Sequence, residues 1–293
     1  MKLQGSIVAL ITPFKDGKID EVSLRNLIKW HIQEGTHGIL ILGTTGEAAT
    51  IDMEERKRVM EIALEEAKGK IPLIVGTGTN NTKKVLEYTK LAEEMDFDAA
   101  LIVTPYYNKP TQKGLYEHYS YIAKNTKIPI ILYNVPGRTG VNLLPDTTAK
   151  LAQIDNIIAI KEACGDIKQV TELLLKCPKD FTILSGDDFT AYASVTLGVK
   201  GVISVAANIM PKEMAQLMEN ALNGKISEAQ ELNLKLYPLY KAMFVETNPV
   251  PAKAALWLMG KIETPEVRSP LSQLTEKSLE TLKTVLKENY NLV

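Results

Sequence analysis

Lys161 is the residue whose type and setting most directly suggest covalent chemistry. It follows the apolar run 157–160, which is typical of a buried strand. Burial disfavours the charged form of an amine and lowers its pKa, and a neutral lysine amine is a nucleophile toward carbonyl compounds. The position therefore indicates Schiff-base chemistry. The alternative is a lysine whose ammonium group emerges into water beyond the strand.

Further polar side chains stand where other apolar runs end. Tyr133 closes the run 129–133, and a phenol there can relay protons to or from a reacting group. Arg138 is one of only five arginines in the chain. Its planar guanidinium suits a carboxylate, and a salt bridge within its loop is the alternative. Tyr106 is interpreted instead as an aromatic anchor at an interface.

Two loops add information about the ligand. The turn Gly-Thr-Thr-Gly-Glu at 43–47 has glycines that allow close backbone approach, and its hydroxyls and amides can hold a carboxylate. Taken alone it is a weak signal, since Gly and Thr are ordinary turn residues. The loop Ser-Gly-Asp-Asp at 185–188 is acidic where many barrels bind phosphate. We therefore expect a substrate without a phosphoryl group, and the same loop disfavours a pyridoxal phosphate enzyme.

The elements that position these residues follow from the alternation of short apolar runs with helical patterns. Helices are predicted over 20–35 and 52–69, the second with Asp52 as N-cap and Glu55 three residues on. Apolar strands joined by helical crossovers indicate a parallel sheet, and eight such units close most economically into an α/β protein of the TIM (β/α)8 barrel type. An open doubly wound sheet is the competitor, but residues 12–17 are not the glycine-rich loop that usually follows its first strand. The strand candidates are 7–11, 38–42, 72–76, 99–103, 129–133, 157–160, 181–184 and 201–204.

The chain is predicted to have two parts. Residues 1–223 form the barrel, and residues 224–293 form a carboxyl-terminal helical extension without a strand signal. Three helices are expected in the extension, over 227–246, 251–259 and 275–289. Pro249 and Pro251 separate the first two, because proline cannot continue a helix but can open one.

Composition excludes several classes of function. The net charge is -1 and no block of like charges occurs, so neither nucleic acid nor a membrane is an expected partner. The amino terminus lacks signal-peptide features and no apolar run approaches the about 18 residues of a membrane span, which predicts a cytoplasmic protein. Cys164, Cys177, His31, His37 and His118 give no disulfide framework and no metal-site spacing. No metal and no cofactor are expected.

Several segments together resemble one enzyme family. They are the turn 43–47, Tyr-Tyr-Asn-Lys-Pro at 106–110, Tyr-Asn-Val-Pro-Gly-Arg-Thr at 133–139, Ile-Lys-Glu-Ala at 160–163 and Glu-Thr-Asn-Pro at 246–249. In this order and spacing the chain resembles dihydrodipicolinate synthase, also called 4-hydroxy-tetrahydrodipicolinate synthase, along essentially its whole length. The resemblance implies a Schiff-base-forming lyase of the class I aldolase type, in the N-acetylneuraminate lyase superfamily. It also implies a TIM barrel with a helical carboxyl-terminal domain and a homotetramer, a dimer of dimers.

The resemblance also implies a reaction and a set of roles. The family condenses pyruvate with L-aspartate 4-semialdehyde in the diaminopimelate route of lysine biosynthesis. Lys161 would form the imine with pyruvate, whose positive nitrogen stabilises the carbanion-like methyl carbon without a metal. Arg138 would hold the carboxylate of the semialdehyde. The remaining positions are Tyr133, Thr44 and Tyr107 as the proton relay, with Tyr107 from the neighbouring subunit, Thr44 and Thr45 at the pyruvate carboxylate, and Gly186 and Ile203 lining the site through their backbones.

Two alternatives stay open, and one feature departs from the family. Sialic acid lyases and 2-keto-3-deoxy sugar acid aldolases resemble the same scaffold but usually lack the Gly-Arg-Thr run at 137–139, and a silent ligand-binding barrel would form no imine. Arg56 and Lys84 stand where lysine-inhibited members supply partners for the ammonium group of the inhibitor, so weak or absent feedback inhibition by lysine is expected. The other matching positions are Ala48, Ala49, Met53, Asn80 and Tyr106.

Overall fold

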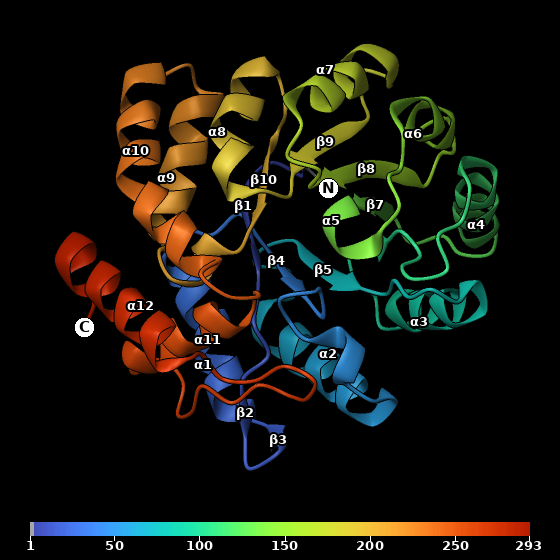
Figure 1. Cartoon of the computed structure of the whole chain (residues 1–293). Helices are drawn as coiled ribbons and strands as arrows, with labels where there is room; N and C mark the ends of the chain where they lie inside the picture. The colour runs from blue at the N-terminus through green and yellow to red at the C-terminus, as the bar shows by residue number, and fades with distance from the viewer. Residues whose placement is uncertain (1–2) are drawn as a thin grey trace. The chain divides into compact units, whose positions relative to one another are not determined.

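Eight parallel strands form a closed barrel in the computed structural model, which describes residues 3–293 (Figure 1). The strands are β1 (Gly5–Ala9), β4 (Gly38–Ile41), β5 (Leu73–Gly76), β6 (Ala99–Val103), β7 (Ile130–Asn134), β8 (Ile157–Glu162), β9 (Thr182–Ser185) and β10 (Gly201–Ser204). Their order around the barrel is β1-β10-β9-β8-β7-β6-β5-β4, so strands that follow one another in the chain are neighbours in the sheet. The predicted α/β class and TIM barrel are confirmed. Each predicted strand exists, and its ends lie within two residues of the predicted ones.

Strand β8 differs from its predicted bounds in a way that matters for the site. The apolar run predicts an end at residue 160, but the strand continues through Lys161 and Glu162, both of which are buried. Strand pairing with β7 on one side and β9 on the other extends to these two residues. Ladder hydrogen bonds and buried partners therefore override the polarity of the two side chains.

A small hairpin was not among the predicted elements. Strands β2 (Phe14–Lys15) and β3 (Lys18–Ile19) pair antiparallel across Asp16 and Gly17, which both have positive φ. An Asp-Gly pair is a strong signal for this kind of two-residue turn, and the signal is visible in the sequence. It was missed because the flanking segments are only two residues long and show no alternation.

Several helices begin where the sequence offers a capping side chain. Asp20, Asp52, Asn81 and Thr111 each accept a backbone N–H in the first turn of the helix that follows, and Asp52 with Glu55 forms the predicted capping box. No helix within residues 3–293 is long and apolar enough to cross a membrane. The helices before the extension are α1 (Glu21–Gln33), α2 (Met53–Ala67), α3 (Thr82–Glu94), α4 (Gln112–Lys124), α5 (Pro136–Thr139), α6 (Pro145–Leu151), α7 (Ile167–Lys176), α8 (Asp188–Leu197) and α9 (Pro211–Leu222).

The described residues group into two compact units. The first contains residues 3–5 and 74–203, and the second contains residues 6–73 and 204–293. In the first unit, α3, α4, α6 and α7 follow one another along the outer side of the strands, as Figure 1 shows. Side chains from these helices pack on those of β6 to β9 in one apolar cluster, which includes Ile102, Leu132, Ile160 and Leu173, all fully buried.

The second unit contains the carboxyl-terminal helices. They are α10 (Ile226–Met243), α11 (Val250–Leu258) and α12 (Glu276–Tyr290), within a few residues of the three predicted ranges. Helix α10 packs on α9 and α12, and α12 also packs on α11 (Figure 1). The predicted boundary between the barrel and the extension, at residue 223, lies between α9 and α10. The division into residues 1–223 and 224–293 stays a prediction.

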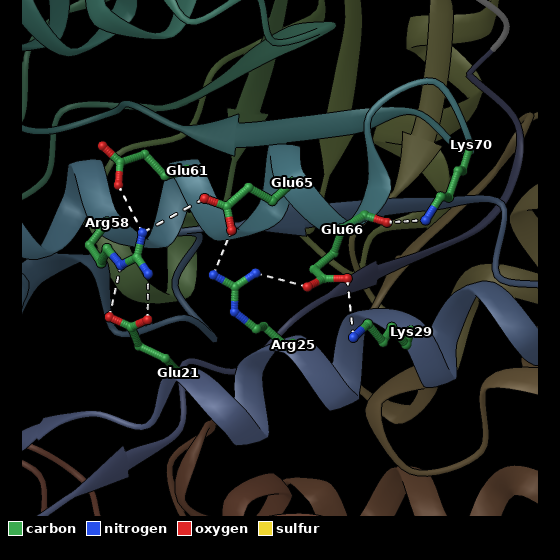
Figure 2. Close-up of polar contacts among 8 residues, drawn as sticks. All are labelled: Glu21, Arg25, Lys29, Arg58, Glu61, Glu65, Glu66 and Lys70. Carbon is green, nitrogen blue, oxygen red and sulfur yellow. Dashed lines mark hydrogen bonds and ion pairs between the residues drawn. The ribbon is translucent and has the colours of Figure 1, made fainter.

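Helices α1 and α2 of the second unit are joined by a network of ion pairs (Figure 2). The Arg58 guanidinium donates to both carboxylate oxygens of Glu21, at 2.6 and 2.8 Å, and holds the pKa of Glu21 below its usual value. Arg25, from α1, pairs with one carboxylate oxygen of Glu65 and one of Glu66 on α2. Because most of these groups are exposed, we expect them to fix how α1 lies along α2 rather than to supply much stability.

Two buried histidines should make the free energy of unfolding depend on pH. Burial lowers the pKa of His31 to about 3 and that of His118 to about 4. The unfolded chain protonates each near pH 6.5, so below that pH the unfolded state binds more protons and the free energy of unfolding falls as the solution is acidified. Each histidine should contribute about 1.4 kcal/mol per pH unit between roughly pH 6 and 4. The free energy of unfolding of the His31→Gln variant, measured with denaturant at several pH values, should depend on pH less steeply by that amount. An unchanged pH dependence would contradict this assignment.

Candidate active site

Lys161 and Tyr133 lie side by side at the carboxyl ends of β8 and β7. They are register partners in the parallel ladder, and Lys161 Nζ is 4.3 Å from the centroid of the Tyr133 ring. Lys161 is 5% exposed and Tyr133 is 6% exposed. This burial rules out the solvent-exposed alternative for Lys161. An amine held against a phenol, out of bulk water, is a suitable arrangement for imine formation with proton transfer.

Gly186, directly after β9, makes room for the Lys161 side chain. A Cβ added to Gly186 would lie 2.8 Å from Lys161 Cε and 2.7 Å from Ala163 Cβ, closer than side chains pack. The Gly186 amide also donates to the Glu162 carbonyl at 2.7 Å, which ties the loop to β8. The absence of a side chain is therefore needed at this position, as expected for a residue that lines a site through its backbone.

A buried polar network fixes the strand ends that carry these two side chains. Asn134 and Glu162 each follow a candidate residue in the chain and point to the opposite face of the sheet. Asn134 Nδ2 donates to both carboxylate oxygens of Glu162, at 3.0 and 3.1 Å, and Gln169 Nε2 donates to Oε2 at 3.0 Å. Burial raises the pKa of Glu162, and these donors oppose that rise. The network cross-links β7 and β8 beside Tyr133 and Lys161.

Arg138 and Tyr107 lie on two connected loops of the same unit. Arg138 is exposed on the short helix α5, and Tyr107 is 88% exposed with a φ of 74°. The Tyr107 amide donates to the Thr139 carbonyl at 3.4 Å, which joins the two loops. Ile203, in contrast, is buried within β10. A phenol this exposed at a sparsely populated backbone conformation is a candidate for contact with another molecule.

The turn 43–47 belongs to the second unit and follows β4. Its ends have unusual backbone conformations, with φ of 53° at both Leu42 and Glu47. The Gly46 and Glu47 amides donate to the Gly43 and Thr44 carbonyls, both at 3.1 Å, so the segment folds tightly on itself. A non-glycine residue held in the left-handed backbone conformation costs about 1–3 kcal/mol, and such residues cluster at functional sites. Thr44 is half-buried and Thr45 is buried.

A buried ion pair holds the end of this turn. Lys253 Nζ, from α11, is 2.6 Å from Glu47 Oε1, and their side chains are 0% and 2% exposed. The Arg268 amide donates to the other Glu47 oxygen at 2.9 Å. Burial lowers the pKa of Lys253 to about 8, although Glu47 favours its charged form. Phe14 covers the pair, with its ring centroid 3.9 Å from Lys253 Nζ.

The structure brings three of the predicted residues together and shows further residues that support them. Lys161, Tyr133 and Gly186 are in contact, and the loops of Arg138 and Tyr107 lie in the same unit. Within residues 3–293 no group of His, Cys, Asp or Glu side chains could hold a metal ion. The supporting residues Asn134, Glu162, Gln169, Asn248 and Lys253 were assigned no role from the sequence. The only signal available was that three of them, Asn134, Glu162 and Asn248, stand in the motifs that carry the family resemblance.

Comparisons with known proteins identify the family. The model of the dihydrodipicolinate synthetase family matches residues 2–289. A 4-hydroxy-tetrahydrodipicolinate synthase of Thermodesulfovibrio yellowstonii is 56% identical over 284 residues, which cover 97% of each chain. The crystal structure of dihydrodipicolinate synthase from Aquifex aeolicus superposes with a TM-score of 0.97 at 46% identity and covers 99% of both chains. The chloride-inhibited enzyme of Acinetobacter baumannii, complexed with pyruvate, gives 0.96 at 47% identity and covers 98% of this chain and 99% of that one.

The fold defines a (β/α)8 barrel protein, and a buried lysine at the end of one of its strands suits Schiff-base chemistry. The chain belongs to the dihydrodipicolinate synthetase family. The family predicted from the motifs is confirmed, as is the predicted class of enzyme, a lyase that acts through a lysine Schiff base.

Proposed function

We propose that this chain condenses pyruvate with L-aspartate 4-semialdehyde, the activity of 4-hydroxy-tetrahydrodipicolinate synthases. The observation that carries the proposal is the buried Lys161 amine beside the Tyr133 phenol, at the strand ends of a barrel. Relatives at about half identity or more over nearly the whole chain carry the same activity in their names, which agrees with the function predicted from the sequence.

The reaction begins at Lys161. Its amine attacks the ketone carbon of pyruvate, and loss of water gives a positively charged imine that draws electrons from the methyl group. Loss of a methyl proton gives an enamine, which attacks the aldehyde carbon of the semialdehyde and forms the new carbon–carbon bond. The amino group of the second substrate then displaces the Lys161 amine from the imine carbon, which closes the ring and frees the enzyme.

Proton transfers and carboxylate binding are assigned to the surrounding residues. Tyr133, whose ring lies against the Lys161 amine, is assigned proton exchange at the Lys161 nitrogen, and Thr44 and Tyr107 are assigned the rest of the relay. The carboxyl ends of the strands of a (β/α)8 barrel carry its active site, so the turn after β4 is assigned to the same substrate. Thr44 and Thr45 hold the pyruvate carboxylate there, while Gly186 and Ile203 line the site through their backbones.

Arg138 is assigned to the carboxylate of the semialdehyde, which distinguishes this activity from that of the sugar-acid aldolases. Loss of a hydrogen bond between charged groups is worth about 1.5–3 kcal/mol, so the Arg138→Ala variant should raise the KM for semialdehyde about tenfold to hundredfold. The pyruvate concentration for half-maximal imine formation should change by less than about twofold. Arg138→Lys keeps the charge but loses the planar fork, so its KM for semialdehyde should lie between those of the wild type and Arg138→Ala.

The outcome separates the competing functions. An equal loss of semialdehyde use and of imine formation would count against the assignment of Arg138. Parallel assays of the wild type with 2-keto-3-deoxy sugar acids and N-acetylneuraminate should show no comparable cleavage. Preference for one of those substrates would place the chain among the other pyruvate aldolases.

Assembly, location and regulation complete the proposal. A homotetramer, with Tyr107 of one subunit reaching the site of another, agrees with the 88% exposure of this side chain in the single chain. A cytoplasmic location agrees with a biosynthetic activity on small soluble substrates. Feedback inhibition by lysine is weak or absent in this proposal, since Arg56 and Lys84 match the positions at which lysine-inhibited members supply partners for the inhibitor's ammonium group.

A further inference from the structure

Asn248 makes a buried hydrogen bond to the turn that is assigned to the pyruvate carboxylate. Its Nδ2 donates to Thr45 Oγ1 at 3.0 Å, and both residues are buried. Asn248 comes from the segment between α10 and α11, about two hundred residues further along the chain. The segment itself is anchored, because Glu246 accepts from the Thr275 amide at 3.0 Å and from its hydroxyl at 2.8 Å.

The direction of this hydrogen bond has a chemical consequence. A threonine hydroxyl has one hydrogen to donate and two lone pairs that accept. An amide N–H from Asn248 occupies a lone pair of Thr45 Oγ1 and cannot accept the hydroxyl hydrogen. That hydrogen therefore remains available for another acceptor. A substrate carboxylate is such an acceptor, and hydrogen bonds to an ionised acceptor are about twice as strong as neutral ones.

The charge balance of the turn points the same way. Glu47 is two residues from Thr45, and an unpaired carboxylate buried there would repel a substrate carboxylate. Lys253 neutralises this carboxylate, with its Nζ 2.6 Å from Glu47 Oε1. Lys253 belongs to α11, which begins two residues after Asn248. The Thr12 hydroxyl also fixes the Gly46 carbonyl at 2.8 Å. The segment around Asn248 and α11 thus supplies both the donor to Thr45 and the counter-charge to Glu47.

We propose that Asn248 is a positioning residue for substrate binding: it orients the Thr45 hydroxyl as a hydrogen-bond donor toward the carboxylate of pyruvate, within a turn whose charge Lys253 balances. This inference rests on the proposed function, in which Thr45 contacts that carboxylate. It assigns a binding role to the Glu-Thr-Asn-Pro segment at 246–249, which lies outside the barrel strands.

The test measures pyruvate binding in variants that change the hydrogen-bond character of position 248. Asn248→Asp has nearly the same shape but can only accept, so it would draw the Thr45 hydroxyl hydrogen toward itself. The pyruvate KM and the pyruvate concentration for half-maximal borohydride trapping should both rise about tenfold to hundredfold. The amount of adduct at saturating pyruvate and the KM for semialdehyde should stay within about twofold. Asn291→Asp, at an exposed position of the same unit, is the matched control and should behave as the wild type.

A double-mutant cycle separates positioning from a general structural effect. Asn248→Ala removes the donor without adding charge and should raise the half-saturating pyruvate concentration about threefold to tenfold. In a Thr45→Val background, which has no hydroxyl to orient, the same substitution should change it by less than twofold. If the aspartate variant does not fold, the cycle with alanine carries the test alone.

The outcomes distinguish this inference from the function on which it rests. Unchanged pyruvate affinity in the folded Asn248 variants would overturn it, and so would effects that simply add to those of Thr45→Val. A wild-type chain that forms no pyruvate adduct at Lys161 would instead overturn the proposed function itself.

Discussion

The Lys161→Met variant is expected to fold normally and to lose at least about 10⁴-fold in turnover, because loss of a covalent nucleophile removes most of the catalysis that depends on it. Methionine has a similar length and flexibility, so it can occupy the space between Tyr133 and the backbone of Gly186 without the amine. Steady-state rates with both substrates measure the loss.

Thermal unfolding provides the control for this variant. The Lys161 side chain is buried, and an amine is costly to desolvate. Its replacement by methionine should therefore leave the melting temperature unchanged or slightly higher. Lys253→Met removes a second buried lysine, which is assigned no covalent role, and so separates loss of the covalent nucleophile from loss of a buried amine. A Lys161→Met variant that retains more than about one hundredth of the wild-type turnover would show that another group carries the chemistry.

The Glu47→Leu variant is expected to lose about 3–5 kcal/mol of folding free energy, the usual cost of removing one partner of a buried ion pair. The substitution leaves the Lys253 ammonium, which is 0% exposed, without a counter-charge, and leaves the Arg268 amide without its acceptor. For a chain of this length the melting temperature should fall by about 6 to 15 °C. Glutamate and leucine are both disfavoured by the left-handed backbone conformation at position 47, so backbone strain does not account for the difference.

Two further variants isolate the uncompensated charge as the cause. Glu47→Gln keeps one acceptor oxygen, which can serve Lys253 or the Arg268 amide but not both, and should lose roughly half as much. The double variant Glu47→Leu/Lys253→Met replaces the pair by apolar side chains and should recover most of the loss, because well-packed apolar groups are often as stable as a buried ion pair. A double variant as unstable as Glu47→Leu alone would attribute the loss to packing instead.

The barrel could be predicted from the sequence because its strands are buried on both faces. Nearly all residues of β4, β6 and β10 are buried, and such strands appear as continuous apolar runs. The helices α1 and α2 could be placed from the caps Asp20 and Asp52. The hairpin of β2 and β3 could not, since two-residue strands leave no periodic pattern.

The candidate site was predicted only where the sequence marks chemistry directly. Lys161 and Tyr133 stand at the ends of consecutive apolar runs, and the ladder between β7 and β8 places them side by side. The contacts of Asn248 with Thr45 and of Lys253 with Glu47 join residues about two hundred positions apart. Long-range polar contacts of this kind leave no local pattern. Phe14, which covers Lys253, comes from the hairpin that was also missed.

Borohydride reduction in the presence of pyruvate, followed by mass mapping of the peptides, shows which lysine forms the imine. Reduction converts an imine between an enzyme lysine and pyruvate into a stable secondary amine. The assignment of Lys161 as the imine-forming residue predicts one adduct of the mass of reduced pyruvate on the peptide that contains Lys161, and none in the Lys161→Met variant. An adduct on a different lysine, or no adduct at saturating pyruvate, would contradict it.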